Sequence, residues 1–242
     1  MHRMAMIGLG LTLVTAGCVD PEMEQRLADA EQKLQDLEKD IASSGGGGGG
    51  ARVNQEKEEG AKQAVEEINN LIASLQIDEA KQKIASAEKE FAGTRTVSRL
   101  GRTKTELAVV GTEAGELDVE KWYQGNAHMD DGSATLMIFW ESWCPHCKRE
   151  VPKLEAMHNK YKDRGLNLIG LTKVTKSATD ESVQSFIDEK ELTYPVAKEK
   201  DGNLSTRFGV RGVPAAAIVK DGKVVWRGHP ARLTDTTIEK VL

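Results

Sequence analysis

Residues 139–147 of the chain are FWESWCPHC. The apolar run Thr135 to Trp140 predicts a fully buried strand, and helical periodicity begins at the cysteines, so a strand is expected to turn directly into a helix here. Two cysteines, Cys144 and Cys147, lie at the start of that helix with two residues between them. A C-x-x-C motif between a strand and a helix predicts an α/β domain with thiol chemistry.

The spacing and position of the two cysteines suggest which thiol attacks the substrate and which resolves the mixed disulfide. Residues three apart lie on one side of a helical turn, close enough for a disulfide that opens readily. The partial positive charge at a helix N-terminus favours a thiolate, so Cys144 is the expected nucleophile. His146, Lys148 and Arg149 would stabilise the same thiolate. Cys147, one turn further in, would resolve the mixed disulfide.

Other uses of a cysteine pair fit the sequence less well. A tetrahedral zinc site needs two more ligands, and the sequence has no second cysteine pair or His-x-x-x-His spacing, so no metal is expected. Residue 148 is lysine rather than histidine, which argues against attachment of a c-type haem. A purely structural bridge remains open, although so short a loop gains little from closure.

Short β-rich runs alternate with helical ones from about Leu107 onward, which predicts an α/β domain with a small mixed sheet flanked by helices. The expected strands are Leu107 to Val110, Thr135 to Trp140, Leu166 to Leu171, Ala215 to Val219 and Lys223 to Trp226. The expected helices are at about Cys144 to Asp163, Thr179 to Lys190, Gly202 to Phe208, and Thr234 to the C-terminus. Asp221 and Gly222 supply a hairpin turn.

Two further segments carry a family resemblance. Residues 139–147, the E-V-P at 150–152, and GVRGVPAAAIVKDGKVVWRG at 209–228 resemble the TlpA/ResA-type thioredoxin-like family of membrane-tethered thiol–disulfide oxidoreductases, over roughly Thr105 to Leu242. The resemblance implies a thioredoxin-like domain in which Pro214 is cis and packs against the cysteines, while the backbone of Val213 pairs with an extended substrate segment. A trans proline that starts a strand is the alternative.

The same resemblance implies the function. It suggests disulfide exchange with protein substrates, without a cofactor and with a possible redox partner in the inner membrane, often to reduce cysteines of apocytochromes or copper sites. Two rivals stay open: a peroxiredoxin-like peroxidase, and a non-catalytic scaffold whose helical parts bind partners. A formal net charge of -5 with scattered Lys and Arg gives no reason to expect nucleic acid.

The sequence departs from the family pattern in two ways. Thioredoxin has a buried aspartate six residues before its first cysteine, where this chain has Ile138. Glu141 or Glu150 would have to accept the proton of the second cysteine. The dipeptide Pro145-His146 is that of DsbA, whose potential is about −120 mV against about −270 mV for thioredoxin, so the direction of electron flow stays open.

The N-terminus predicts export and a lipid anchor. The apolar run Met4 to Val14 follows a short polar start and is too short to span a bilayer. Thr15-Ala16-Gly17-Cys18 resembles the lipobox of bacterial lipoproteins, although leucine is usual in place of Thr15. The resemblance implies a signal peptide at 1–17, lipidation of Cys18, and a periplasm-facing protein of the cell envelope, with inner or outer membrane undecided. Ordinary secretion with a chance cysteine is the alternative.

A helical stalk and a hairpin are expected between the anchor and the α/β domain. Heptad-spaced apolar residues predict a coiled-coil stalk at 18–44, which either self-associates or is a single solvated helix: Met23, Leu27, Ala30, Leu34, Leu37 and Ile41. Six glycines at 45–50 cannot hold a helix and should form a flexible linker. Residues 51–93 should form a helical hairpin, with Asp78 as N-cap of its second helix and Gly93 as its stop.

Overall fold

The computed structural model describes residues 25–26, 28–36, 48–176 and 178–242. The chain forms two compact units, and the boundary between them lies between Val53 and Asn54. In the first unit, residues 25–26 and 28–36 are helical and exposed, and the Leu34 side chain is 61% exposed. The predicted signal peptide, Cys18 and the greater part of the stalk lie outside the described residues. None of the described helices is both long and apolar enough to cross a bilayer.

Helix α2 (Gly48–Ala73) begins inside the glycine run, so the expectation that residues 45–50 cannot be helical is wrong for Gly48 to Gly50. The reason lies in helix cooperativity. Extending an existing helix adds one hydrogen bond for each residue fixed, which offsets the cost of about 1 kcal/mol for each glycine relative to alanine.

A six-stranded mixed sheet forms the centre of the second unit and confirms the predicted α/β fold. Its strand order is β1-β4-β3-β2-β5-β6, with β2, β3 and β4 parallel to one another and the other pairs antiparallel. The strands are β1 (Val119–Gln124), β2 (Ala134–Trp140), β3 (Leu166–Thr172), β4 (Val196–Glu199), β5 (Ala215–Lys220) and β6 (Lys223–Gly228).

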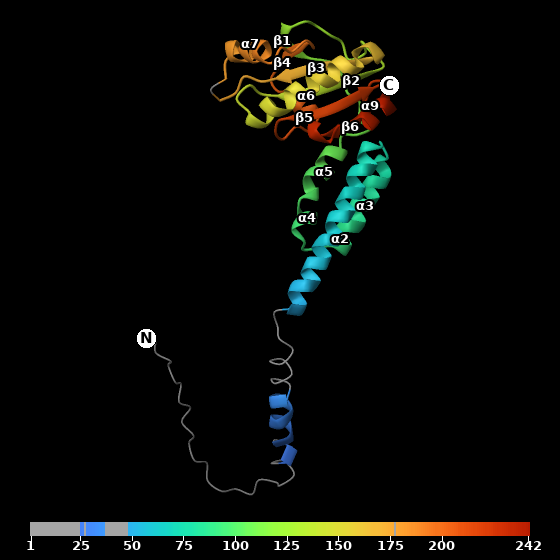
Figure 1. Ribbon diagram of the computed structural model, residues 1–242, viewed down its shortest axis with the longest axis vertical. Helices are drawn as coiled ribbons and strands as arrows, with labels where there is room; N and C mark the ends of the chain where they lie inside the picture. Colours follow the sequence, from blue (N-terminus) through green and yellow to red (C-terminus); the bar gives the residue numbers. More distant parts are fainter. Residues whose placement is uncertain (1–24, 27, 37–47, 177) are drawn as a thin grey trace, which may run out of the picture. The chain divides into compact units, whose positions relative to one another are not determined.

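Helices cover both faces of this sheet (Figure 1). They are α6 (Pro145–Tyr161), α7 (Asp180–Glu189), α8 (Asn203–Arg207) and α9 (Asp235–Val241). Strand β2 is buried along its whole length, and its side chains alternate between two hydrophobic cores. Leu136 and Ile138 belong to the core under α6, α7 and α9, whereas Phe139 packs with Phe208 beside α8. A strand with no polar face is therefore held on both sides just before the cysteines.

Three sequence-based expectations about the elements are wrong or incomplete. The residues expected to form a first strand at Leu107 to Val110 instead end helix α5 (Leu100–Leu107) and enter a turn. Strands β1 and β4 were not expected. β4 has only four residues, and β1 is half-buried on nearly every residue, so neither gives an alternating pattern.

The helical hairpin consists of α2 and α3 (Ile77–Glu90), followed by the short helices α4 (Arg95–Ser98) and α5. Asp78 is not the N-cap of α3 but lies in its first turn, because the N-cap is Gln76 and the helix begins two residues earlier than expected, at Ile77. The hairpin packs on the sheet domain. The Thr237 hydroxyl donates to the carbonyl of Ala73 at 3.0 Å, and α5 lies against β6 (Figure 1).

Candidate active site

The two cysteines lie where β2 ends and α6 begins. Cys144 is the N-cap residue of α6, and its Sγ accepts a hydrogen bond from the backbone N–H of Cys147 at 3.4 Å. Pro145 follows in the first turn, where its missing N–H costs nothing because that group has no partner within a helix. The leading sulfur therefore lies at the positive end of a 17-residue helix.

Both cysteines are free thiols, and they differ in burial. Cys144 is 4% exposed and Cys147 is fully buried at 0%. Burial raises the pKa of Cys147, and the hydrogen bond with Cys144 and the negative charge of Glu141 raise that pKa further. The second thiol is thus kept protonated behind the first.

The loop before β5 meets the leading cysteine. The peptide bond between Val213 and Pro214 is cis, as the family resemblance implies, and Pro214 is buried. The Cys144 thiol donates to the carbonyl oxygen of Val213 at 3.6 Å. Arg211 and Gly212, just before this point, are exposed.

The basic side chains after the first cysteine lie at the surface. His146, Lys148 and Arg149 are all exposed, and Arg149 Nη2 donates to Nδ1 of His146 at 2.6 Å. In the part of the chain that the structure describes, none of the three forms a hydrogen bond with either sulfur. Their stabilising effect on the Cys144 thiolate stays a prediction.

Trp143, beside Cys144, is fixed by a small polar network. Its Nε1 donates to Oε2 of Glu141 at 2.5 Å, and the Thr175 hydroxyl donates to the same oxygen. Lys176 Nζ lies 3.2 Å from the centre of the Trp143 ring, a cation–π contact. Thr175 and Lys176 follow strand β3, and nothing in their local sequence indicated a place at this site.

Of the two acids that the sequence offered as proton acceptors, only Glu141 acts on the pKa of Cys147. Its charge contributes to the raised pKa of Cys147. Glu150 instead pairs with Lys153 at 3.0 Å. Ile138 is fully buried in the core, so the position of thioredoxin's aspartate is apolar here.

A cavity of about 360 Å³ lies beside the cysteines. Its walls come from the ends of β2 and β3 and from the loop before β5, and they include Glu141, Trp143, Lys173, Arg211, Gly212 and Val213. Neither cysteine lines this groove itself, but Trp143, the neighbour of Cys144, and Val213, whose carbonyl contacts the Cys144 thiol, both do.

Comparisons with known proteins agree with this geometry. The AhpC/TSA family model matches residues 110–227, which include both cysteines and Pro214. The thiol-disulfide oxidoreductase ResA of Bacillus thuringiensis subsp. konkukian is 32% identical over 126 residues, which cover 51% of this chain and 71% of that protein. The chain belongs to the ResA family of thiol–disulfide oxidoreductases. The chain is therefore an enzyme of the oxidoreductase class.

Other relatives are more distant. ResA of Halalkalibacterium halodurans is 22% identical over 152 residues, covering 63% of this chain and 80% of that protein. A solved thioredoxin domain of a thiol-disulfide oxidoreductase from Bacteroides vulgatus is 22% identical, with a TM-score of 0.47, over 55% of this chain and 98% of that one. The match to the family model begins after α5, so helices α2 to α5 lie outside that match.

Proposed function

We propose that this ResA-family enzyme exchanges disulfides with protein substrates of the bacterial cell envelope through Cys144 and Cys147. One observation carries the proposal: a nearly buried thiol caps helix α6 beside a groove, with a second, fully buried thiol directly behind it. The first thiol can meet a partner, and the second is reserved for the sulfur of the first.

In the reductive direction the reaction has two displacements. The Cys144 thiolate attacks one sulfur of a substrate disulfide, whose S–S bond breaks to release a thiolate and leave a mixed disulfide. Cys147 then loses its proton and attacks Sγ of Cys144, releasing the second substrate thiolate. The substrate gains two electrons and the pair becomes a disulfide. The reverse sequence oxidises a substrate dithiol.

The surroundings of the pair suggest roles for three more residues. Glu141 is the better placed acceptor for the Cys147 proton, because its charge already acts on that thiol. The backbone of Val213 is the expected partner of an extended substrate segment, since its carbonyl already faces Cys144. Pro145 and His146 occupy the positions between the cysteines that tune the potential of such pairs.

The reduction potential of the cysteine pair decides the direction of electron flow. Only a reducing pair could take part in the maturation of cytochrome c or of metal sites by reduction of their cysteines. The full chain is equilibrated with glutathione buffers and alkylated, and the two active-site cysteines are counted by peptide mass. A value near −270 mV makes the protein a reductant that needs electrons from a membrane partner, and one near −120 mV makes it a disulfide donor. A pair that never exchanges with glutathione would overturn the proposal.

The same proposal includes an anchor at Cys18 and an extended N-terminal region. Processing after residue 17 and acylation of Cys18 would tether a stalk (18–44), a linker (45–50), a hairpin (51–93) and the thioredoxin-like domain (105–242) to a membrane facing the periplasm. Two or more acyl chains are enough for stable anchoring. Labelling with radioactive palmitate should mark the natural chain and not Cys18→Ser, and chemical cross-linking tests whether the stalk self-associates.

A further inference from the structure

A second cavity, of about 330 Å³, lies between helix α5, strand β6 and the loop at residues 209–212. Polar and basic side chains dominate its lining. The residues that matter here are Arg102, Thr105, Glu106, Arg211, Gly212 and Arg227. The helical extension therefore builds one wall of this cavity, and the sheet domain builds the other.

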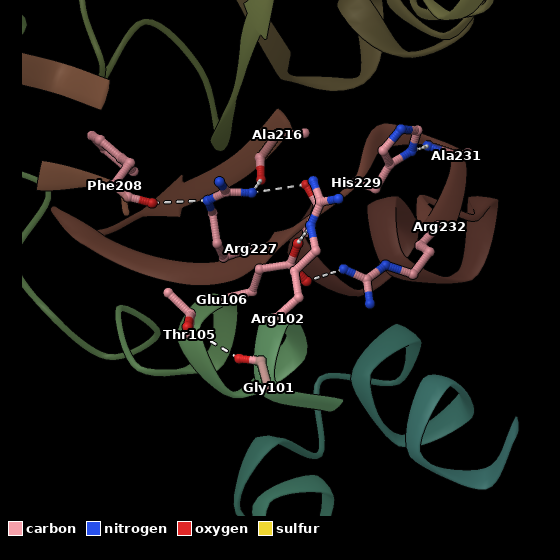
Figure 2. Close-up of polar contacts among 11 residues, drawn as sticks. Gly101, Arg102, Thr105, Glu106, Phe208, Ala216, Arg227, His229, Ala231 and Arg232 are labelled. Atoms are coloured by element: carbon pink, nitrogen blue, oxygen red, sulfur yellow. Dashed lines mark hydrogen bonds and ion pairs between the residues drawn. The ribbon is translucent and has the colours of Figure 1, made fainter. Parts of the chain in front are cut away.

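The single carboxylate of this wall is already neutralised. Glu106 is 4% exposed, and its two oxygens accept hydrogen bonds from different arginines (Figure 2). Arg102 Nε donates to Oε1 at 3.3 Å, and Arg232 Nη2 donates to Oε2. Within the part of the chain that the structure describes, neither Arg211 nor Arg227 has an acidic partner within 4.0 Å. The positive charges of Arg211 and Arg227 beside the cavity are therefore not neutralised by an ion pair.

Arg227 presents that charge from a buried position. Its side chain is held by carbonyl groups: Nε donates to Phe208 at 2.8 Å, and Nη1 donates to Gly228 at 2.9 Å and to Ala216 at 3.3 Å. The residue is 3% exposed. No residue in the described ranges accepts a hydrogen bond from Nη2, which Figure 2 shows without a dashed line. Nη2 is not among the buried polar atoms that lack a partner, so this edge of the guanidinium is open to solvent, and a ligand in the cavity that Arg227 lines could accept a hydrogen bond from it.

The guanidinium keeps its charge in this setting. Burial lowers the pKa of Arg227 to about 10, which still leaves it protonated at neutral pH. A planar guanidinium with a free edge suits a carboxylate, and hydrogen bonds between two charged groups are stronger than neutral ones.

The second cavity adjoins the groove beside the cysteines. Arg211 and Gly212 line both. Val213, whose carbonyl contacts Cys144, is the next residue along the chain. A side chain built on Gly212 would meet no atom within 4 Å, so no other side chain or backbone crowds the chain at this shared residue. Consecutive Cα atoms are about 3.8 Å apart, so Arg211 lies within about 8 Å of Val213.

We propose that this second cavity is a subsite for a carboxylate of the substrate polypeptide, an Asp or Glu side chain about two to four residues from the cysteine that reacts with Cys144. An extended segment rises about 3.3 Å for each residue, so that spacing reaches from the sulfur past Gly212. The proposal rests on the proposed function and names a feature of its substrates. Continuity with the groove favours a substrate side chain over a free anion.

The test uses the reduced full chain and short synthetic peptides, each with one cysteine bound to 2-nitro-5-thiobenzoate. Release of the coloured thiol gives the exchange rate. Glutamate and glutamine are compared at every position from four residues before the cysteine to four after it. Rates are measured for the natural chain, Arg211→Gln and Arg227→Lys, with Lys223→Gln on β6 as a control that removes an exposed charge away from the cavity.

The expected result is at least about a tenfold preference for glutamate over glutamine at one or two adjacent positions, the size of one charge-assisted hydrogen bond. Arg211→Gln and Arg227→Lys should reduce it to about twofold or less, and Lys223→Gln should leave it intact. Thermal unfolding checks that Arg227→Lys is folded, while Arg211 is exposed and independent of the core.

Three results would overturn the inference. Equal rates for glutamate and glutamine peptides would remove the subsite and leave the proposed function standing, and stabilisation by sulfate in that case would assign the cavity to a free anion. An equal preference at every position would indicate general electrostatic attraction. If no peptide reacted at all, the proposed function would fail and the subsite with it.

Discussion

The Sγ atom of Cys144 lies 3.6 Å from the carbonyl oxygen of Val213, 69 residues further along the chain. Antiparallel pairing of β2 with β5 produces this contact, because Phe139 near the end of β2 lies opposite Ala215 at the start of β5. The segment that follows one strand and the segment that precedes the other therefore meet at one edge of the sheet. The proposed nucleophile and the backbone proposed to receive the substrate are therefore positioned by the same strand register.

Selective alkylation should separate the two thiols. In the reduced protein at pH 7, iodoacetamide is expected to modify Cys144 well before Cys147, because the latter is fully buried and burial raises its pKa. Peptide mass mapping reads out each cysteine separately. After unfolding in urea the two should react at similar rates, and selective modification of Cys147 in the folded protein would refute this assignment.

Stability of the reduced protein should fall at alkaline pH. Folded Cys147 keeps its proton above the pKa of an unfolded thiol, about 8.5, so above that pH the folded state binds more protons than the unfolded one. The stabilisation is complete below about pH 8.5 and is lost as pH rises, by up to about 1.4 kcal/mol for each pH unit. Urea unfolding between pH 7 and 10 should show this slope in the natural chain and a flatter one in Cys147→Ala.

The ion pairs of Glu106 should hold the helical extension on the sheet domain. Glu106→Ala leaves the half-buried Arg232 without its carboxylate, and a loss of about 2 kcal/mol in the free energy of unfolding is expected, between the values for exposed and for fully buried pairs. Arg102→Gln, which removes the exposed end of the same network, should cost less than about 1 kcal/mol. Urea titration of both variants measures the two losses in unfolding free energy. Equal losses would mean that the ion pair between Glu106 and Arg232 does not hold the helical extension on the sheet domain.

The local parts of the site were predictable from the sequence, and the reason is physical. A helix start and a C-x-x-C spacing depend only on neighbouring residues, so the sequence alone predicts that Cys144 and Cys147 lie together at the N-terminus of a helix. The buried run at 135–140 likewise predicted β2, because a strand with neighbours on both faces has no polar positions.

Structural features that depend on contacts between residues far apart in the sequence could not be predicted from local patterns. Leu107 to Val110 has the composition of a strand, but packing of α5 against β6 makes its first residue the end of a helix. Thr175 and Lys176 reach Trp143 only through the parallel pairing of β2 and β3. Likewise, no local pattern marked Arg227 as buried.

Trapping a mixed disulfide tests the central claim most directly. In Cys147→Ser the resolving thiol is absent, so reaction with a peptide disulfide should stop at a covalent adduct on Cys144, seen by mass under non-reducing conditions and released by dithiothreitol. Cys144→Ser should form no such adduct at residue 147. An adduct at Cys147 in that second variant, or none at Cys144 in the first, would contradict the assignment of Cys144 as the attacking thiol.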